Sequence, residues 1–246
     1  MKNQSIIIKL FVLTVFFLPI VFNIQANILK NRNINIGDSC FDHKDYLTAL
    51  IHYKKAFDTD KEFSQQMLSR MAMIEEASDH YVMALFYLNS MYYYFPDSRV
   101  IRKMEDLGNK YHLSGYNYTD LEYVISIYKE YYYYIIFSLS AIGIPFIIYL
   151  FMRKRKKQNL GFRPLIFFSI LGIVFYLNNF DITPTMGIIQ TDCQLMEGPS
   201  SGSNVIEFTE LGQRVRIISK EDVWYKIAWK DKNVFIRDIY LLHVGN

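Results

Sequence analysis

The chain has few of the residues that build catalytic and metal sites. Its 246 residues include two cysteines, Cys40 and Cys193, and five scattered histidines. Two cysteines so far apart make no disulfide framework, and no CxxC pair or Cys/His spacing typical of a metal site occurs. Phosphate-binding, dinucleotide-binding, zinc-protease and nucleophile-elbow motifs are absent as well. We therefore expect a protein that is not an enzyme, with no cofactor, no metal and no small-molecule substrate.

A net positive charge is missing from the segments that could fold outside a membrane. Residues 27–130 contain 12 basic and 15 acidic residues, and residues 181–246 contain 7 basic and 9 acidic residues. The basic excess lies in residues 153–163, which hold six basic residues and no acidic one. Nucleic-acid binding needs a basic patch on a folded surface. The charge distribution therefore argues against nucleic acid as a partner.

Apolar runs divide the chain, and the first lies within residues 1–26. It follows Lys2 and Lys9, is too short for a comfortable membrane span, and leads to the small residue Ala26. A positive start, an apolar core and a small residue before the cleavage point are typical of a signal peptide. An uncleaved anchor helix is the alternative interpretation.

The other two apolar runs predict a membrane hairpin. In residues 131–152, four tyrosines precede 18 uncharged residues, and Tyr favours the membrane boundary. The basic loop 153–163 is expected in the cytoplasm, where short basic loops stay. Residues 164–180 form the second predicted span, although the apolar run there is shorter. Both flanking domains would then lie outside the cytoplasm.

A repeat with a period of 35 residues lies in residues 27–130. Residues 46–53 (YLTALIHY) align without a gap with residues 81–88 (YVMALFYL). This pattern resembles the tetratricopeptide repeat of paired helices, although Lys61 stands where that family has a terminal proline. The frame residues that carry the resemblance are Gly37, Tyr46, Ala49, Tyr53 and Ala56 in the first unit, and Ala72, Tyr81, Ala84, Leu88 and Pro96 in the second.

The resemblance implies a groove that binds a segment of a partner protein. In the family's geometry, the residues facing this groove are Ile34, Asp38 and Phe41 in the first unit, and Gln66, Ser69, Met73 and Glu76 in the second. We predict that these seven residues contact the partner, while the frame residues hold the helices together.

Residues 186–246 are expected to form a small all-β domain. The five predicted strands are residues 187–190, 194–197, 213–219, 223–229 and 233–236, with an exposed loop at 198–203. About sixty residues in five short strands suit a small closed barrel.

This domain resembles the bacterial SH3-like domains. The resemblance rests on residues 198–200, 211–215, 224–227 and 240–241, and Trp224, Tyr225, Ile227, Trp229 and Tyr240 are expected to pack the barrel. It implies cell-wall binding, peptide binding or a supporting role. Residues 233–236 depart from the family's usual Gly-Trp-Val, which argues against a family-like aromatic groove.

The order of the parts resembles the BatE-like family of the Bacteroides aerotolerance operon. The expected architecture is a multi-domain membrane protein with an all-α tetratricopeptide repeat, a transmembrane helical hairpin and a small all-β SH3-like barrel. The resemblance implies a location in the bacterial inner membrane, with both soluble domains in the periplasm. It also implies envelope proteins as partners, among them membrane proteins of the same operon that carry von Willebrand factor A domains.

These expectations combine into one functional prediction and one alternative. The prediction is a non-enzymatic scaffold or adaptor for protein–protein interactions in the cell envelope, within an aerotolerance or stress-related complex. The alternative is an envelope anchor that binds the cell wall, through contact of its SH3-like domain with peptidoglycan.

Overall fold

The structure is a computed structural model that describes residues 32–156, 161–162, 165, 167–169, 172–173, 176 and 185–243. The predicted signal peptide and most of the predicted second span lie outside the described residues. The chain divides into two compact units. The first comprises Met1–Glu62 and Tyr133–Leu160, and the second comprises Phe63–Tyr132 and Gly161–Asn246.

A pair of short helices, α2 (Arg32–Asp42) and α3 (Tyr46–Lys55), belongs to the first unit. The two helices approach closely at Gly37, where a Cβ atom would lie 2.5 Å from the ring of Tyr53. The Tyr53 side chain is completely buried, and its hydroxyl donates a hydrogen bond of 2.7 Å to the Asp38 carboxylate. A small residue opposite a large aromatic therefore sets the spacing of this pair.

The chain leaves α3 through a π-helical turn, η2 (Ala56–Asp60), and not through a proline. Lys61 follows in the left-handed conformation with φ 53°, and its N–H donates to the carbonyl of Ala56. A left-handed residue ends a helix by turning the chain away from the axis. Lys61 thus ends the helix at the position where the repeat pattern has a proline.

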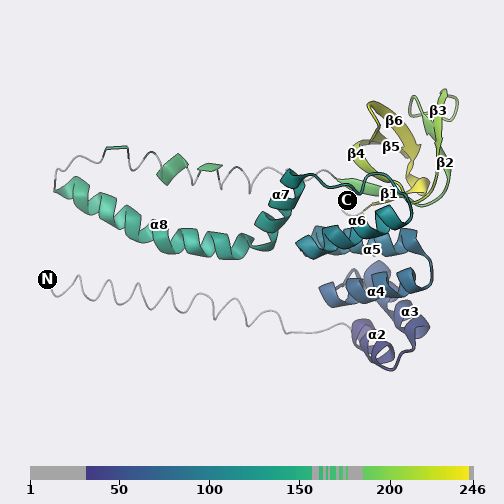
Figure 1. Ribbon diagram of the computed structural model, residues 1–246, viewed down its shortest axis with the longest axis horizontal. Helices are drawn as coiled ribbons and strands as arrows, with labels where there is room; N and C mark the ends of the chain where they lie inside the picture. The colour runs from purple at the N-terminus through teal and green to yellow at the C-terminus, as the bar shows by residue number, and fades with distance from the viewer. Residues whose placement is uncertain are drawn as a thin grey trace. The chain divides into compact units, whose positions relative to one another are not determined.

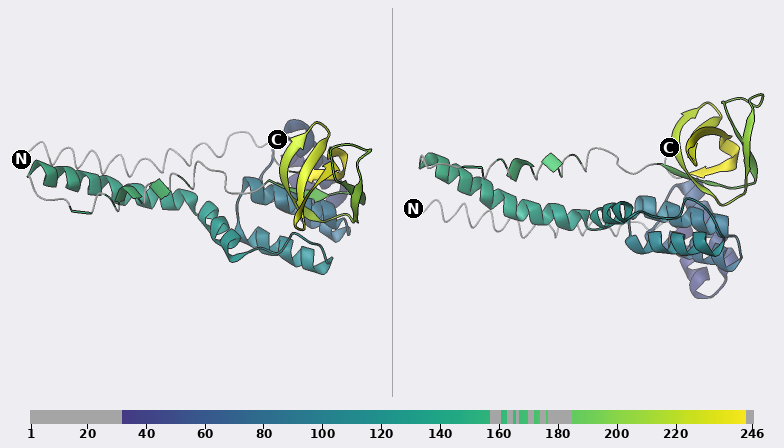
Figure 2. Two further views of the ribbon diagram at one scale, coloured as in Figure 1. Left: turned by 90° about the horizontal axis from the view of Figure 1, so that it is seen from above. Right: turned by 45° about the horizontal axis from the view of Figure 1, so that its top comes forward.

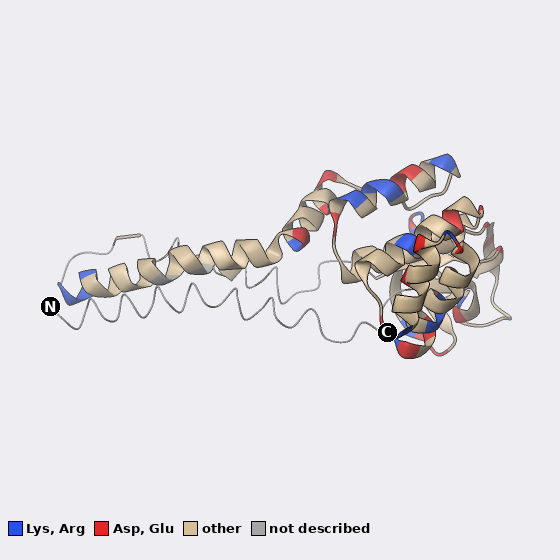
Figure 3. Cartoon of the chain, turned by 90° about the horizontal axis from the view of Figure 1, so that it is seen from below, with Lys and Arg blue, Asp and Glu red and all other residues tan. Residues whose placement is uncertain are grey.

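One helix in the described part of the chain, α8 (Tyr132–Arg155), is long and apolar enough to cross a membrane. It covers most of the first predicted span, residues 131–152, and extends into the predicted basic loop. Its charged residues are confined to Arg153–Arg155 at the C-terminal end, seen in blue in Figure 3. Many of its large apolar side chains are exposed, unlike those of a helix in a soluble core.

The described part of the second unit before residue 132 has four α-helices (Figure 1): α4 (Gln65–Ala77), α5 (Tyr81–Tyr94), α6 (Ser98–Lys110) and α7 (Asp120–Glu130). Each packs on the next along the chain. Ser64, Asp97 and Thr119 cap the first turns of α4, α6 and α7 by accepting backbone N–H bonds. Such side-chain caps satisfy donors that have no partner within the helix.

A seven-stranded antiparallel sheet completes the second unit. Its strands are β1 (Met186–Ile189), β2 (Cys193–Met196), β3 (Val205–Thr209), β4 (Arg214–Glu221), β5 (Trp224–Trp229), β6 (Lys232–Arg237) and β7 (Leu241–His243), with a short helix η3 (Asp238–Tyr240) before β7. The strand order is β3-β2-β6-β5-β4-β1-β7, so β3 and β7 are the edges. Figure 2 shows that the sheet is strongly curled.

The prediction of helices followed by a β-rich segment is confirmed, but the predicted closed barrel of five strands is wrong. The sheet is open and has two further strands, β3 and β7. Most side chains of β3 are exposed, so its sequence lacks the alternation that marks a half-buried strand. Strand β7 has three residues, which is too short to produce a pattern.

Alternate residues of β5 serve two separate apolar clusters. Tyr225 and Ile227 lie in the main core of the sheet, and Trp229 packs against that core. Trp224 points to the other face, where it packs with Met196 and Phe235. Successive side chains of a strand point to opposite faces, as the sequence of residues 223–229 predicts.

Candidate binding site

A short connection between α6 and α7, residues 113–118, binds the sheet within the second unit. The Tyr116 hydroxyl donates a hydrogen bond of 2.9 Å to the carbonyl of Gly212. The backbone N–H and the hydroxyl of Ser114 donate to Oε1 of Gln213, at 2.7 and 2.6 Å. We call this connection, together with residues 212–214, the latch.

Arg214 is the charged residue at the centre of the latch, and it is only 8% exposed. Its guanidinium donates to Oδ1 of Asn89 at 3.3 Å and lies 5.1 Å from the ring centre of Tyr118. Its backbone N–H donates to the carbonyl of Ser114 at 3.1 Å. Gly115 passes so close that a Cβ atom there would lie 2.0 Å from the Arg214 carbonyl oxygen. The latch therefore joins helix and sheet through backbone contacts that tolerate no larger residue at position 115.

Two tyrosines, the buried Tyr116 and the half-buried Tyr118, face Arg214 without adding a charge to the latch. Burial raises the pKa of Tyr118 to about 12, and burial also raises the pKa of Tyr116. Both rings remain neutral at physiological pH and offer their faces to the guanidinium, an arrangement that stabilises a cation.

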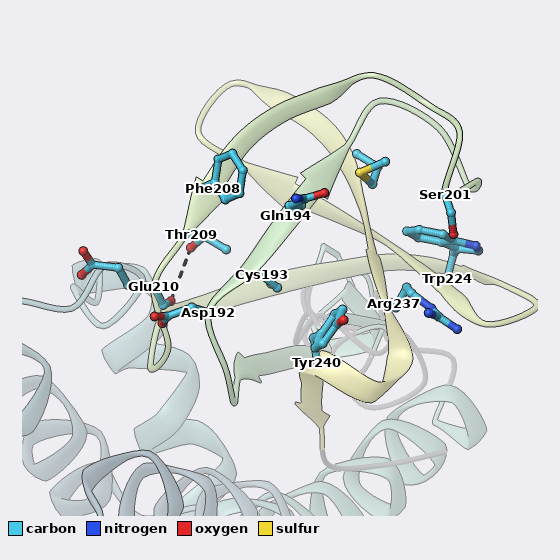
Figure 4. Close-up of a pocket in the computed structure, with 11 residues that line it drawn as sticks. Asp192, Cys193, Gln194, Ser201, Phe208, Thr209, Glu210, Trp224, Arg237 and Tyr240 are labelled. Carbon is cyan, nitrogen blue, oxygen red and sulfur yellow. Dashed lines mark hydrogen bonds between the residues drawn. The ribbon is translucent and has the colours of Figure 1, made fainter.

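The sheet also carries an open groove of about 620 Å³, drawn in Figure 4. Aromatic and apolar side chains line it: Met196, Phe208, Trp224 and Tyr240. Phe208 stands on the edge strand β3 and is 72% exposed, whereas Trp224 is 8% exposed. A concave surface with aromatic walls and a few polar groups is the usual form of a ligand site.

The two ends of the groove differ in charge. Arg237 and Ser201 lie beside Trp224 at one end, while Asp192 and Glu210 lie at the other (Figure 4). The Asp192 carboxylate accepts a hydrogen bond of 2.8 Å from the backbone N–H of Leu211, in the turn between β3 and β4. Such a groove suits an extended ligand that carries an anionic group at one end and a cationic group at the other.

The groove offers no activated nucleophile. Its thiol, Cys193, is buried, and burial together with the neighbouring Asp192 raises the pKa of that thiol to about 11. A thiol acts as a nucleophile in its deprotonated form, so Cys193 is inert at neutral pH. Across the described ranges, no three His, Cys, Asp or Glu residues come close enough together to hold a metal ion.

The predicted contact residues on α4 share one face of that helix. Gln66, Ser69 and Met73 are exposed, and Met73 reaches 48% exposure. Glu76 is half-buried and forms an ion pair of 2.8 Å with Lys103 of α6. The structure therefore brings these four residues together on a surface that a partner can reach.

The predicted contact residues on α2 belong to the first unit and are placed differently. Ile34 is 4% exposed and lies in the core, so the prediction that it faces a groove is wrong. A hydrophobic side chain on the inner face of α2 is buried against its neighbours. Asp38 is half-buried and bound to Tyr53. Phe41 is half-buried, with its ring 5.3 Å from that of Tyr46.

Most of the predicted frame residues are buried. Gly37, Ala49, Tyr53, Ala56, Ala72, Ala84 and Leu88 are buried, Tyr81 and Pro96 are half-buried, and Tyr46 is 41% exposed. The Tyr81 ring stacks on Tyr111 at 4.2 Å. In the sheet, Trp229 donates to Glu207 at 2.9 Å, and Tyr240 lines the groove.

Sequence reasoning singled out Trp224 and Tyr240 but not the rest of the groove. Phe208 lies on the missed strand β3, and Arg237 follows the last buried residue of β6. The sequence of β3 has no alternation that could have marked Phe208 as part of a strand.

No protein-family model matches the chain, and no curated protein matches it significantly. Function is therefore inferred from the contacts of this chain, and the resemblances noted in the sequence stay predictions.

Proposed function

We propose that this chain is a non-enzymatic, membrane-anchored scaffold of the bacterial cell envelope. It displays a tetratricopeptide-like helical array and an SH3-like sheet on the periplasmic side of the inner membrane. The observation that carries the proposal is the latch. It joins the helices of the second unit to the sheet, although the apolar helix α8 lies between these two parts along the chain.

The latch supports a membrane hairpin. Its bonds connect residues 113–118 to residues 212–214, and α8 lies between these segments in the chain. Two parts that share buried contacts must lie on the same side of a membrane. If α8 leaves that side, the chain has to return before β1. Residues 164–180 are the apolar segment that supplies the return.

The charge pattern supports a periplasmic position for the latched body. Arg153–Arg155 stand at the end of α8, and the sequence that follows is basic too. Short basic loops stay in the cytoplasm. The helices and the sheet lie at the other ends of the hairpin, so the proposal puts them outside the cytoplasm.

The exposed face of α4 is the proposed contact for a partner protein. Met73 offers an unburied thioether side chain, and Met is common at adaptable binding surfaces. Gln66 and Ser69 add hydrogen-bonding groups on the same face. We propose an envelope protein as the occupant, and the resemblance to the BatE-like family favours membrane proteins with von Willebrand factor A domains.

Photo-crosslinking in living cells tests this proposal. A photoreactive amino acid replaces Met73, and in a control it replaces Ile218 of β4, which is 45% exposed and so closely matched. We expect position 73 to form an adduct with one or a few envelope proteins. Position 218 should form no adduct with the same proteins. Adducts that are absent at 73, or identical at both positions, would contradict a specific site on α4.

Alanine variants provide a second test of the predicted contacts. Asp38→Ala, Met73→Ala and Glu76→Ala should weaken recovery of the partner from crosslinked membranes. Arg102→Ala on the exposed face of α6 serves as a control. A partner recovered equally with all four variants would remove these residues from the interface.

Cell-wall binding is the second candidate function, and the groove favours it. Arg237 beside Trp224 can pair with a carboxylate, while Asp192 and Glu210 can pair with an amine. Peptidoglycan stem peptides carry both groups on an extended backbone.

Sedimentation with purified peptidoglycan separates this candidate from the first. The solubilised full chain should sediment with the wall, and Arg237→Ala should reduce the bound fraction, while Arg216→Ala should not. Both arginines are exposed, but only Arg237 lines the groove. A full chain that stays in the supernatant would eliminate wall binding and leave the scaffold proposal intact.

A further inference from the structure

Helix α7 has two faces of different character. One face is fixed to the helical array: the Tyr123 hydroxyl donates to Glu105 at 2.6 Å, the Ser98 N–H donates to Glu130 at 3.1 Å, and Ser126 is completely buried. These contacts come from both ends of α7. They set the rotation of the helix about its axis.

The other face of α7 exposes a stripe of apolar side chains. Leu121 is 67% exposed, Val124 65%, and Ile127 and Tyr131 49% each. Their spacing of three, three and four residues places them on one side of a helix. We call these four residues the α7 stripe. Glu122, Lys129 and Glu130 lie off the stripe, whereas Asp120, in the first turn, lies on the same side as the stripe at the end away from α8.

The α7 stripe lies next to the candidate membrane span in the chain. Only Tyr131 separates the end of α7 from the start of α8. Tyr131, Tyr133 and Tyr134 are 49%, 79% and 74% exposed, and tyrosine favours the membrane–water boundary. Because α8 begins at that boundary, the stripe cannot be far from the lipid headgroups.

We infer that α7 lies on the outer surface of the membrane with the α7 stripe inserted among the lipids. The inference rests on the proposed membrane anchor. An interfacial helix buries an apolar face at the boundary between headgroups and acyl chains. Since α7 is fixed to α6, this contact holds the second unit at a set orientation to the bilayer.

The charge of α7 distinguishes this mode from the electrostatic binding of basic helices. Its segment carries three acidic residues and one basic residue. Anionic lipids therefore supply no attraction. Insertion depends on apolar area, and high salt should leave it unchanged.

Spin labelling of the full chain in nanodiscs of zwitterionic lipid tests the inference. Single labels are attached at Leu121→Cys, Val124→Cys and Ile127→Cys in a Cys40→Ser, Cys193→Ala background. Asn109→Cys, exposed on α6, is the control in water, and Ile142→Cys, 70% exposed on α8, is the control in lipid. Collisions with oxygen and with a water-soluble nickel complex report the surroundings of each label.

For labels on the α7 stripe, the ratio of oxygen collisions to nickel collisions should be severalfold higher than for the label at position 109. This difference should be the same in low and high salt. Stripe labels with the same collision ratio as position 109 would overturn the inference. Stripe labels shielded from both oxygen and nickel would overturn it too, because protein would then cover the stripe. If position 142 also reports water, the membrane anchor itself has failed; if 142 reports lipid, only the α7 inference has.

Discussion

Replacing Gly115 with alanine should break the latch. Gly115 has φ +86°, and an added Cβ would lie 2.0 Å from the carbonyl oxygen of Arg214. A left-handed conformation costs a non-glycine residue about 1–2 kcal/mol. Forcing an extra carbon into a packed contact costs about 1–3 kcal/mol more. The two contributions lower the free energy of unfolding of the second unit by roughly 2–5 kcal/mol.

Urea unfolding of the full chain in detergent measures this loss. Trp224 and Trp229 both lie in β5, so tryptophan fluorescence follows the sheet. For a urea dependence of about 2 kcal/mol per M, the midpoint should fall by about 1–2.5 M. In the natural chain, part of the helical circular dichroism should be lost together with the change in fluorescence, because the latch couples the second unit's helices to the sheet. In Gly115→Ala the two transitions should separate.

Gly202→Ala is the matched control, because Gly202 lies in an exposed loop of the same sheet. The nearest atom to its added Cβ would be the Ser200 hydroxyl, at 3.8 Å. Its midpoint should stay close to that of the natural chain. If Gly115→Ala gave the same midpoint as Gly202→Ala, with coincident transitions, the contact between helices and sheet would not contribute to stability and the reasoning from the latch would be refuted.

Three further predictions concern single side chains. Tyr116→Phe leaves the Gly212 carbonyl without its donor and should cost about 1–3 kcal/mol in urea unfolding; an unchanged midpoint would show that the bond does not matter. Burial, and secondarily a nearby lysine, lowers the pKa of His243. The folded sheet therefore favours the neutral ring, its stability is complete above about pH 6.5, and stability is lost as the pH falls further. Midpoints at pH 7.5 and 5.5 should differ less in His243→Gln than in the natural chain, and an equal difference would contradict this. Finally, Cys193 should react with a maleimide much more slowly than the half-buried Cys40 in the native protein, because burial raises the pKa of the Cys193 thiol to about 11. Mass spectrometry of the digested chain measures the two rates. Equal rates would show that the groove is not formed.

Local patterns predicted helices followed by a β-rich segment, and they predicted five of the seven described strands. The 35-residue period placed the helices around Tyr53 and Leu88, and the alternation of residues 223–229 separated Tyr225 from Trp224. These features depend on neighbours within a few residues, so their signal is present in the local sequence.

The latch and the groove could not be predicted in this way. Tyr116 and Gly212 are 96 residues apart, and no periodicity links them. The groove depends on Phe208 and Arg237, which stand on strands that are not consecutive in the sheet. Ile34 was misassigned because family geometry alone gave it a partner-facing role, whereas its apolar side chain is buried in the core.

The position of the sheet relative to the membrane is the most direct test of the account. A reporter that is active only in the periplasm would be fused after Asn246, and separately after Lys156 in a truncated chain. We predict activity after Asn246 and none after Lys156, because the proposed topology has the latched helices and sheet outside the cytoplasm and the basic turn inside. Inactivity at both positions would place the sheet across the membrane from α4–α7, where the latch cannot form. Inactivity after Asn246 with activity after Lys156 would place both the helices and the sheet in the cytoplasm and contradict the proposed orientation.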